Sequence, residues 1–444
     1  MSTSGKAWSP SKIQEPYATQ LRDAVFWFDG KAPPLPPLEG VLDTDVVVVG
    51  GGMMGLMCAR ALRARGQRVC LVEAGTCGAG ASGRSSGLIT PDSELEFRDL
   101  VRQFGAEEAP RLWEFALGGV HAIRQAILED QIDCDMQVQD ALFIATTGRG
   151  AQVISAEHAA RSAFGYSSTI YSRESLPSIL GSPSYFGALR FGNTFSIDGY
   201  RACTGLRQRL LETGVRIFER SPVTRILEHG VETARASVRA PAVIICADRF
   251  LPALGLARRE IYHVQTFLAI SESLSTSEID RMFPRGPLMV WDTDLTYKYF
   301  RLTGDGRLLI GGGTLATTYS RRELHRPQQA VRRLTSYLAK RFPDVRVKFI
   351  ACWPGLIGIS KDFAPVLGCH ARYSSVSYAA GAAGLPWAAA LGRYLAEKVL
   401  DGRDDIDASL AVHRRFPIGP RVQAVLGAPA AFAMSHGILK FGSK

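Results

Sequence analysis

The 444-residue sequence lacks several features that mark specialised classes of protein. It contains no apolar run of about eighteen residues, so no transmembrane helix is expected. The opening MSTSGKAWSPSK has no apolar core of the kind that a secretory signal peptide requires. The eight cysteines stand singly, without a Cys-x-x-Cys pair or a Cys/His cluster at metal-ligand spacing, so no metal site is expected. Together these absences predict a cytoplasmic protein.

A concentrated basic segment is also missing. Lys and Arg total 52 against 42 Asp and Glu, a formal net charge of +10, but the basic residues are scattered. Such a charge favours anionic ligands, whether a dinucleotide or nucleic acid. No RNA-binding module is recognisable, so we expect a solvated basic surface and no specific nucleic-acid partner.

The clearest positive signal is a β-α-β unit near the N-terminus. Residues 45–49, DVVVV, form an apolar β-branched run typical of a buried parallel strand. The turn GGGMMG follows at 50–55, then helix formers at 56–65 and a second strand at 68–72. Glu73 closes that strand.

This arrangement predicts a dinucleotide site. Gly50 makes the tight turn, Gly52 lets the pyrophosphate approach the backbone, and Gly55 lets the helix pack on the strand. The helix N-terminus offers N–H groups to the phosphates. Glu73 accepts the ribose hydroxyls and disfavours a 2′-phosphate.

The segment after Glu73 favours FAD over NAD. Residues 78–87, GAGASGRSSG, are too rich in small residues for the start of a packed helix. One interpretation is a surface loop. The other, which we prefer because of its place behind the ribose-binding acid, is a segment that passes N–H groups along pyrophosphate and flavin.

The rest of the chain predicts two interleaved domains. Helical periodicity at 99–131, 201–212, 322–341 and 386–400 alternates with strand patterns, and 288–314 resembles an antiparallel meander. We expect an α/β plus α+β fold, in which a Rossmann-type FAD-binding domain is interleaved with an antiparallel-sheet substrate domain. The predicted division has three parts: an arm at 1–40, an FAD-binding domain at 41–100, 195–250 and 350–444, and a substrate domain at 101–194 and 251–349.

Beyond the first unit, three segments carry a family resemblance. They read YFRLTGDGRLLIGGGT at 299–314, WPGLIGISKDFAPVLG at 353–368 and YAAGAAGLPWAAALG at 378–392. In this order, with the glycine turn and GASGRSSG, they resemble the D-amino-acid-oxidase-like superfamily of FAD-dependent oxidoreductases. The similarity is greatest to its gamma-glutamylputrescine oxidase and glycine oxidase branch.

The resemblance implies roles for matched positions. The ADP half of FAD would be held by Gly50, Gly52, Gly55 and Glu73, with Val223 beside the adenine. Pyrophosphate and isoalloxazine would run along Ser82, Gly83, Arg84 and Gly87. The last contact, near the flavin pyrimidine ring, would come from Gly381, Gly384, Leu385 and Pro386. Pro386 suits the first position of a helix.

Three departures from the family pattern bear on function. Gly355 occupies the position of the cysteine that bonds the flavin in the sarcosine-oxidase branch, and Cys352 is three residues away, so we expect non-covalent FAD. Ile357 replaces the carboxylate-binding arginine of glycine oxidase, which makes a simple α-amino acid a less favourable substrate. GAAGLPW replaces the usual GxSGHG, which changes the residue that faces the flavin edge. The sequence therefore leaves open whether the reduced flavin reacts with oxygen.

Candidate substrate-contacting residues come from apolar and aromatic segments. Alternation along 296–302 places Tyr297, Tyr299 and Arg301 on one strand face, where the tyrosines would line the pocket and Arg301 would receive an anionic end of the substrate. The alternative is that the tyrosines belong to the sheet core or to the surface. Trp353 and Trp387 fall in segments expected near the flavin. His263 would tune the protonation of the flavin or the substrate, or would be structural. Lys361 is expected to be solvated.

These features predict FAD-dependent oxidation of a C–N bond in a small amine to an imine, by hydride transfer to flavin N5. The electron acceptor, O2 or another, stays open. Alternatives are an RNA-modifying flavoprotein, a flavin-binding subunit of a larger complex, or one that has lost catalysis. The apolar run 422–434 with basic flanks would cover the core, contact a partner subunit or touch a membrane surface; we favour core cover.

Overall fold

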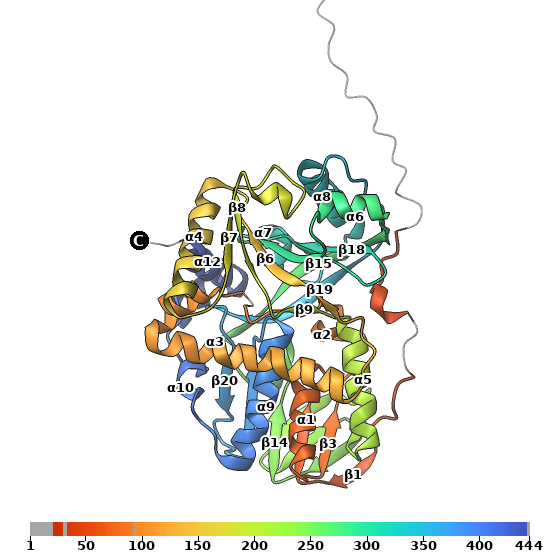
Figure 1. Ribbon diagram of the computed structural model, residues 1–444. Helices are drawn as coiled ribbons and strands as arrows, with labels where there is room; N and C mark the ends of the chain where they lie inside the picture. The colour runs from red at the N-terminus through yellow and green to blue at the C-terminus, as the bar shows by residue number, and fades with distance from the viewer. Residues whose placement is uncertain (1–20, 30–32, 93, 442–444) are drawn as a thin grey trace, which may run out of the picture.

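The computed structural model describes residues 21–29, 33–92 and 94–441. Two large sheets organise these residues, one in the lower and one in the upper half of Figure 1. Helix α3 (Phe97–Glu129) lies across the front between them, with a kink at Gly105, where φ is 85°.

The lower sheet has six strands and forms the predicted Rossmann-type core. Its order is β10-β3-β2-β14-β21-β20, parallel except for the β20–β21 pair. All four valines of β2 are buried, because both faces of the sheet are covered. The strands are β2 (Val46–Val49), β3 (Val69–Val72), β10 (Arg216–Phe218), β14 (Ala242–Ile245), β20 (Val366–Cys369) and β21 (Val376–Ala380).

Different elements cover the two faces of this sheet. Val46 and Val48 pack with α1 (Met53–Ala64), α3, α5 (Gly199–Glu212) and α9 (Leu385–Asp401). Val47 and Val49 pack on a four-stranded sheet instead. That sheet has the order β1-β13-β12-β11 and consists of β1 (Gly40–Asp43), β11 (Val223–Leu227), β12 (Gly230–Thr233) and β13 (Ala236–Arg239).

The upper sheet has eight strands and is largely antiparallel. Only β6 and β16 pair in parallel among its neighbours in the described structure. The meander predicted at 288–314 is confirmed as β16, β17 and β18. In sheet order the strands are β19 (Phe349–Ser360), β15 (Ile261–Ser273), β18 (Arg307–Gly312), β17 (Tyr299–Leu302), β16 (Leu288–Asp292), β6 (Asp140–Ile144), β8 (Gly187–Phe191) and β7 (Thr169–Ser172).

Shorter elements complete the fold. A three-stranded sheet joins β4 (Leu88–Ile89), β9 (Phe195–Ser196) and β5 (Gln137–Val138). The remaining helices are α2 (Ala81–Arg84), α4 (Gly148–Ala163), α6 (Thr276–Met282), α7 (Leu315–Thr318), α8 (Pro327–Arg341), α10 (Asp407–Leu410), α11 (Pro420–Leu426) and α12 (Ala428–Phe441), with 3-10 turns η1 (Phe26–Phe28), η2 (Leu176–Ser178) and η3 (Asp248–Leu254).

The predicted interleaving is confirmed. Strands of the six-stranded sheet come from 46–72, 216–245 and 366–380, and strands of the eight-stranded sheet come from the intervening segments. The domain boundaries themselves stay a prediction. Strand β19, which the boundary at 350 assigned to the FAD-binding part, pairs with β15 along the eight-stranded sheet.

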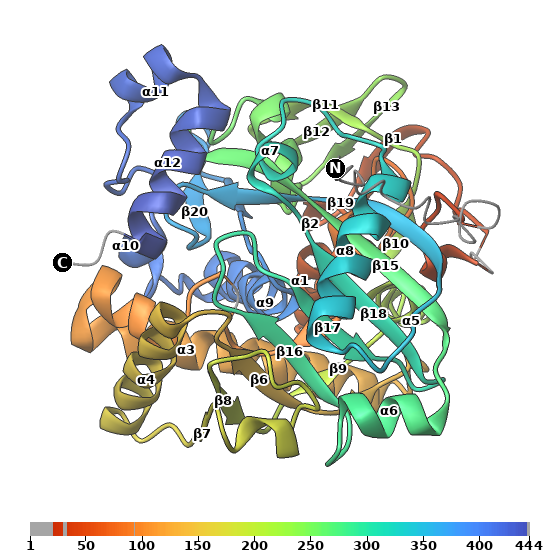
Figure 2. The same cartoon turned by 90° about the horizontal axis from the view of Figure 1, so that it is seen from above.

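The two ends of the described chain lie against the body. Within the predicted arm, residues 1–20 and 30–32 fall outside the described residues, whereas Trp27 is buried and meets Trp353 edge-on. Figure 2 shows α11 and α12 at one edge of the molecule. Phe432 of α12 is buried in the main core, so this part of the C-terminal run covers the core as predicted, while Val425 of α11 is 86% exposed.

Two findings concern the described ranges as a whole. No helix there is long and apolar enough to cross a membrane. No group of three His, Cys, Asp or Glu side chains there is arranged to hold a metal ion. Seven of the eight cysteines are buried and unpaired, so they serve as small apolar core residues.

Candidate functional site

The turn between β2 and α1 exposes the N-terminus of a helix. Gly50 has φ of 109°, and a Cβ there would lie 2.4 Å from the carbonyl oxygen of Cys246. A Cβ on Gly55 would lie 1.8 Å from the carbonyl oxygen of Gly50, so only glycine permits this packing. Gly52 is the N-cap of α1 and supplies no side-chain cap. The first N–H groups of α1 therefore face an open cavity with the positive end of the helix dipole.

That cavity, the cofactor cavity below, runs from the glycine turn to the start of α9. Seven of the thirteen predicted FAD-contacting residues line it: Gly50, Gly52, Glu73, Ser82, Val223, Gly384 and Leu385. Arg84 and Gly87 line a neighbouring cavity instead. Gly55, Gly83, Gly381 and Pro386 lie behind the cavity walls, where they shape the backbone.

Glu73 is held in position by the main chain. Its two carboxylate oxygens accept hydrogen bonds from the N–H groups of Gly51 and Gly75, each at 2.7 Å. Burial raises the pKa of Glu73, and the N–H groups of Gly75 and Gly51 oppose that rise. The carboxylate is thus fixed at the cavity wall, where it can accept hydrogen bonds from the hydroxyls of a ribose.

The glycine- and serine-rich segment after Glu73 contains a short helix, α2, which the sequence analysis had not expected. Ser82 on this helix accepts a hydrogen bond at 3.0 Å from the N–H of Met53, at the start of α1. A Cβ on Gly83 would lie 2.2 Å from the carbonyl oxygen of Gly78. The small residues therefore let α2 fold tightly against α1 and form one wall of the cofactor cavity.

At the other end of the cofactor cavity, Asp248 holds two strand ends together. Its carboxylate accepts hydrogen bonds from the N–H of Gly358 at 2.8 Å and the N–H of Gly381 at 3.1 Å. This fixes the loop that leads to Gly384, the N-cap of α9. Leu385 begins α9, so Pro386 occupies its second position rather than the predicted first.

A second cavity, the substrate cavity below, adjoins the cofactor cavity. The two share Ala81, Ser85, Ile357, Gly384 and Leu385 in their linings, so they meet there. The remaining wall is largely apolar and aromatic. Its distinctive side chains are Leu88, Glu94, Thr266, Trp291, Tyr297, Tyr299, Tyr319, Ile359, Phe363 and His436.

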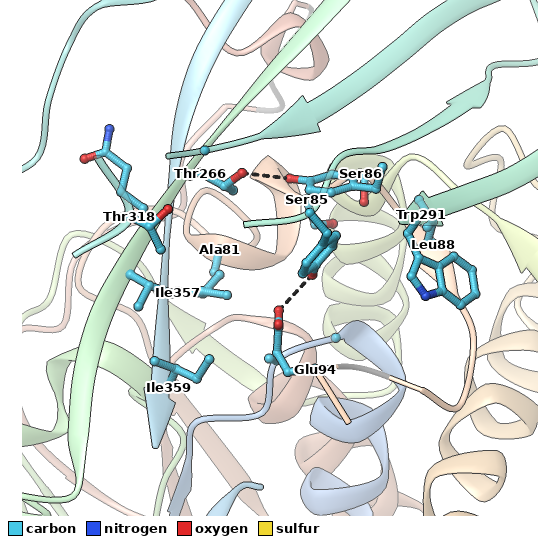
Figure 3. Close-up of a pocket in the computed structure, with 18 of the residues that line it drawn as sticks. Ala81, Ser85, Ser86, Leu88, Glu94, Thr266, Trp291, Thr318, Ile357 and Ile359 are labelled. Carbon is cyan, nitrogen blue, oxygen red and sulfur yellow. Dashed lines mark hydrogen bonds between the residues drawn. The ribbon is translucent and has the colours of Figure 1, made fainter. Parts of the chain in front are cut away.

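Tyr297 and Tyr299 form one wall of this cavity, called the tyrosine wall below. Two hydrogen bonds hold their side chains in place (Figure 3). The hydroxyl of Tyr297 donates to Oε1 of Glu94 at 2.8 Å, and the hydroxyls of Tyr299 and Thr266 lie 3.2 Å apart. Burial, with the charge of Glu94 close by, raises the pKa of Tyr297 well above its usual value, so this tyrosine remains a donor. The prediction that Tyr297 and Tyr299 face a pocket agrees with their position in this lining.

The C-terminal helix contributes His436 to the same cavity. Nε2 of His436 lies 2.7 Å from the carbonyl oxygen of Ser360, and Nδ1 lies 2.7 Å from the hydroxyl of Tyr319. Burial lowers the pKa of His436 to about 4, so the ring is neutral near pH 7. Because a carbonyl only accepts, Nε2 carries the proton and Tyr319 donates to Nδ1.

The predicted role of Arg301 is corrected. Arg301 lies on the same strand face as Tyr299, but the segment around Ser86 and β9 covers that end of the face. The guanidinium is fully buried and donates to the carbonyl oxygens of Ser86, Ile197 and Leu302 at 2.7, 2.8 and 3.1 Å. It lines neither cavity and holds the segment around Ser86, which lines the substrate cavity, from behind.

Three further predicted residues also lie outside both cavities. Trp353 is buried, and its indole N–H donates to the carbonyl oxygen of Arg84 at 3.1 Å. His263 points to the opposite side of β15 from Val264; its Nε2 lies 3.2 Å from the carbonyl oxygen of Ser320. Trp387 is likewise a core residue, whose indole donates to the carbonyl oxygen of Pro91 at 3.1 Å.

Lys361 is buried, not solvated as expected. Its Nζ donates to Oε1 of Gln423 at 2.9 Å and to the carbonyl oxygen of Ile418 at 3.2 Å. It also lies 4.9 Å from the ring centroid of Phe416. The segment before α12 folds back over the residue, a long-range contact that local sequence does not reveal.

Sequence reasoning missed three site residues. Glu94 precedes a long helix, and its sequence position is typical of the polar residues that begin a helix. Asp248 has φ of 43°, rare outside glycine, but nothing in the sequence marks that conformation. His436 lies in an apolar helix, where the pair Ser435-His436 interrupts the apolar run, and that interruption was the one available signal.

Comparisons with known proteins agree with this geometry. A family model described as DAO, FAD dependent oxidoreductase, matches residues 45–398. The chain is 29% identical over 350 residues to gamma-glutamylputrescine oxidoreductase of Escherichia coli, covering 76% of this chain and 79% of that protein. It is 28% identical over 397 residues to the probable oxidoreductase OrdL of Haemophilus influenzae, covering 86% and 90%. The solved glycine oxidase of Geobacillus kaustophilus has a similar fold, with a TM-score of 0.72 at 21% identity over 85% of this chain and 100% of that one.

The residues present fit FAD. The N-cap of α1, Gly52, has no side chain, so this helix N-terminus suits a pyrophosphate, and Glu73 suits a ribose. The start of α9 lies where the two cavities meet and would stabilise negative charge on a reduced flavin. The match covers most of the chain, and the chain belongs to the DAO family of FAD-dependent oxidoreductases.

Proposed function

We propose that this protein oxidises a C–N bond in a small amine to an imine, with the hydride passing to N5 of FAD. The observation that carries the proposal is the meeting of the cofactor cavity with a largely apolar, aromatic cavity at five shared residues. FAD supplies the acceptor of the hydride when bound. The Escherichia coli relative, named for gamma-glutamylputrescine, and the Geobacillus kaustophilus structure, a glycine oxidase, support an amine as substrate.

The protein's own residues have modest tasks in such a reaction. The reacting amine must be neutral, and its C–H must lie against the flavin. Trp291, Tyr297 and Tyr299 exclude water from the cavity and offer aromatic faces to an ammonium group. The hydrogen bonds of the two tyrosines hold these rings in place, so the wall is preorganised.

We further propose that FAD is held without a covalent bond. Gly355, which takes the place of the flavin-bonding cysteine, lines the substrate cavity. The nearby Cys352 lines neither cavity, and burial raises its pKa to about 12, which suppresses the reactive thiolate.

A simple α-amino acid is a poor candidate substrate. Ile357 lies where the two cavities meet, so it places an apolar group beside the position expected for the reacting carbon. Arg84 also lines the substrate cavity, but its Nε donates to the carbonyl oxygen of Ala79 and its guanidinium lies 3.9 Å from Glu323. A carboxylate next to Ile357 would lose its hydration without a paired cation.

The test begins with the absorbance spectrum of the purified protein. We expect a flavin spectrum, release of the flavin into the supernatant on acid precipitation, and bleaching when an amine is added without oxygen. Readmitting O2 or a dye then identifies the acceptor. A colourless protein that also rejects added FAD, or a flavin that no amine reduces, would contradict the proposal.

A further inference from the structure

Glu94 is a carboxylate placed in an otherwise largely apolar cavity. It lines the substrate cavity but not the cofactor cavity, so it is not among the five residues that the two cavities share. Figure 3 shows its side chain directed toward the tyrosine wall. Among the described residues its one hydrogen-bond partner is Tyr297, which donates to Oε1 at 2.8 Å.

The charged neighbours of Glu94 leave it without a direct counter-ion. The other acid in the lining, Asp92, lies 3.5 Å from Arg161. Arg84 lies 3.9 Å from Glu323. Lys440 on α12 lowers the pKa of Glu94. Its Nζ lies over the ring of Phe363, 5.7 Å from the centroid, and among the described residues it forms no ion pair with Glu94.

An uncompensated carboxylate in such surroundings is energetically costly. Burial is the largest influence on Glu94 and disfavours its charged form. A ligand cation placed beside Oε2 would remove that cost, and the aromatic rings of Trp291, Tyr297 and Tyr319 would add cation–π attraction. The cavity is therefore suited to a positive group beside Glu94 and to a neutral reacting group where the two cavities meet.

We propose that Glu94 binds a protonated second nitrogen of the substrate, so that the substrates are diamines or longer oligoamines. This inference rests on the proposed function for its reacting end. The first nitrogen, neutral, lies where the cavities meet, and its carbon loses the hydride and becomes the imine carbon. The second nitrogen stays protonated, forms no covalent bond and serves as an anchor at Glu94.

The experiment compares the holoenzyme with Glu94→Gln. Glu107→Gln is the matched control, because Glu107 lies on the exposed side of the neighbouring helix α3. The probes are α,ω-diaminoalkanes of three to six carbons, the monoamines of the same length, and the ω-amino acids that replace the second amine by a carboxylate. Dissociation constants come from calorimetry, and limiting rates come from anaerobic reduction of the flavin.

We expect wild type to bind at least one diamine more tightly than its matched monoamine. Glu94→Gln should raise the dissociation constant of that diamine by about ten- to a hundredfold, as expected for the loss of a charge-assisted hydrogen bond. Monoamine affinity should fall much less than diamine affinity, because the amide oxygen of the replacement can still accept the hydrogen bond of Tyr297. Glu107→Gln should behave as wild type.

Three results would overturn the inference. The first is an equal loss of affinity for monoamines and diamines. The second is a fall in the limiting rate for every amine, which would make Glu94 a proton acceptor. The third is tighter binding of the ω-amino acids than of the diamines. If diamines bind through Glu94 but no amine reduces the flavin, the anchor stands and the proposed function fails.

Discussion

Tyr319 on the segment that closes the substrate cavity donates a hydrogen bond to Nδ1 of His436 on the C-terminal helix, 2.7 Å away. The same imidazole donates from Nε2 to the carbonyl oxygen of Ser360 on β19. One neutral ring therefore joins three segments that are distant in sequence, and it does so at the wall of the cavity.

This bridge predicts a loss of stability in acid. The unfolded imidazole has a pKa of 6.5 and the folded one a pKa of about 4, with burial as the cause, so the unfolded chain binds the extra proton between these values. Stability should therefore fall as the pH drops from 6.5 to 4, by on the order of 3 kcal/mol for this group. Denaturant unfolding at a series of pH values measures it.

His436→Gln is the control for that titration. Asp362 and Lys440 also act on the ring, so the slope of wild type contains more than one group. The variant should be less stable at pH 7 and should lose a large part of the dependence between pH 4 and 6.5. An unchanged slope would show that His436 does not titrate in this range.

Arg301→Met tests the structural role of that guanidinium. The substitution leaves the carbonyl oxygens of Ser86 and Ile197 buried without donors, which costs about 2–5 kcal/mol for the pair. Because Ser86 follows Ser82 and Ser85, which line the cofactor cavity, FAD should also dissociate more readily. Thermal unfolding and flavin retention on dilution are the measurements. A variant that keeps both but selectively loses anionic substrates would restore the original prediction for Arg301.

Asp248→Asn should weaken FAD binding without unfolding the chain. Asparagine tolerates the positive φ of this position, but its single carbonyl oxygen replaces two acceptor oxygens, so the N–H of Gly358 or of Gly381 loses its partner. We expect a loss of about 1–3 kcal/mol in stability. FAD affinity by fluorescence titration should fall in parallel. Unchanged affinity would mean that the loop before α9 needs no such support.

Diamine binding should weaken as the pH falls. Burial raises the pKa of Glu94 above its ordinary 4.5, and a protonated carboxyl no longer attracts a cation. The facing tyrosines 297, 299 and 319 all have raised pKa values and stay neutral, whereas the pKa of Asp92 is raised to about 6. The diamine dissociation constant should therefore rise with acidity in wild type and rise less in Glu94→Gln. Equal pH profiles would assign the effect to Asp92 or to the ligand.

The part of the fold predictable from sequence is the part that local chemistry determines. The glycine turn, the all-valine strand and Glu73 lie within thirty residues of each other, and each has a conformational or charge requirement that few residue types meet. The antiparallel meander was predictable because its alternation and turns are also local.

The substrate side was less accessible because distant segments build it. Alternation correctly placed Arg301 on the strand face of Tyr299. It could not reveal that the chain around Ser86 and Ile197 covers this end of the face and buries Arg301. Glu94 and His436 enter the cavity from segments whose own sequences point to no chemistry. Lys361 was misjudged for the same reason, because its partners lie about sixty residues away.

The position of α12 has a practical consequence for anyone preparing the enzyme. The family match ends at residue 398, yet His436, which lines the substrate cavity, lies beyond that limit. Trimming the protein to the matched portion would remove a wall of the substrate cavity and buried core residues such as Phe432, while every residue that lines the cofactor cavity would remain. A yellow preparation is therefore no guarantee of an intact active site, and an affinity tag belongs at the amino terminus.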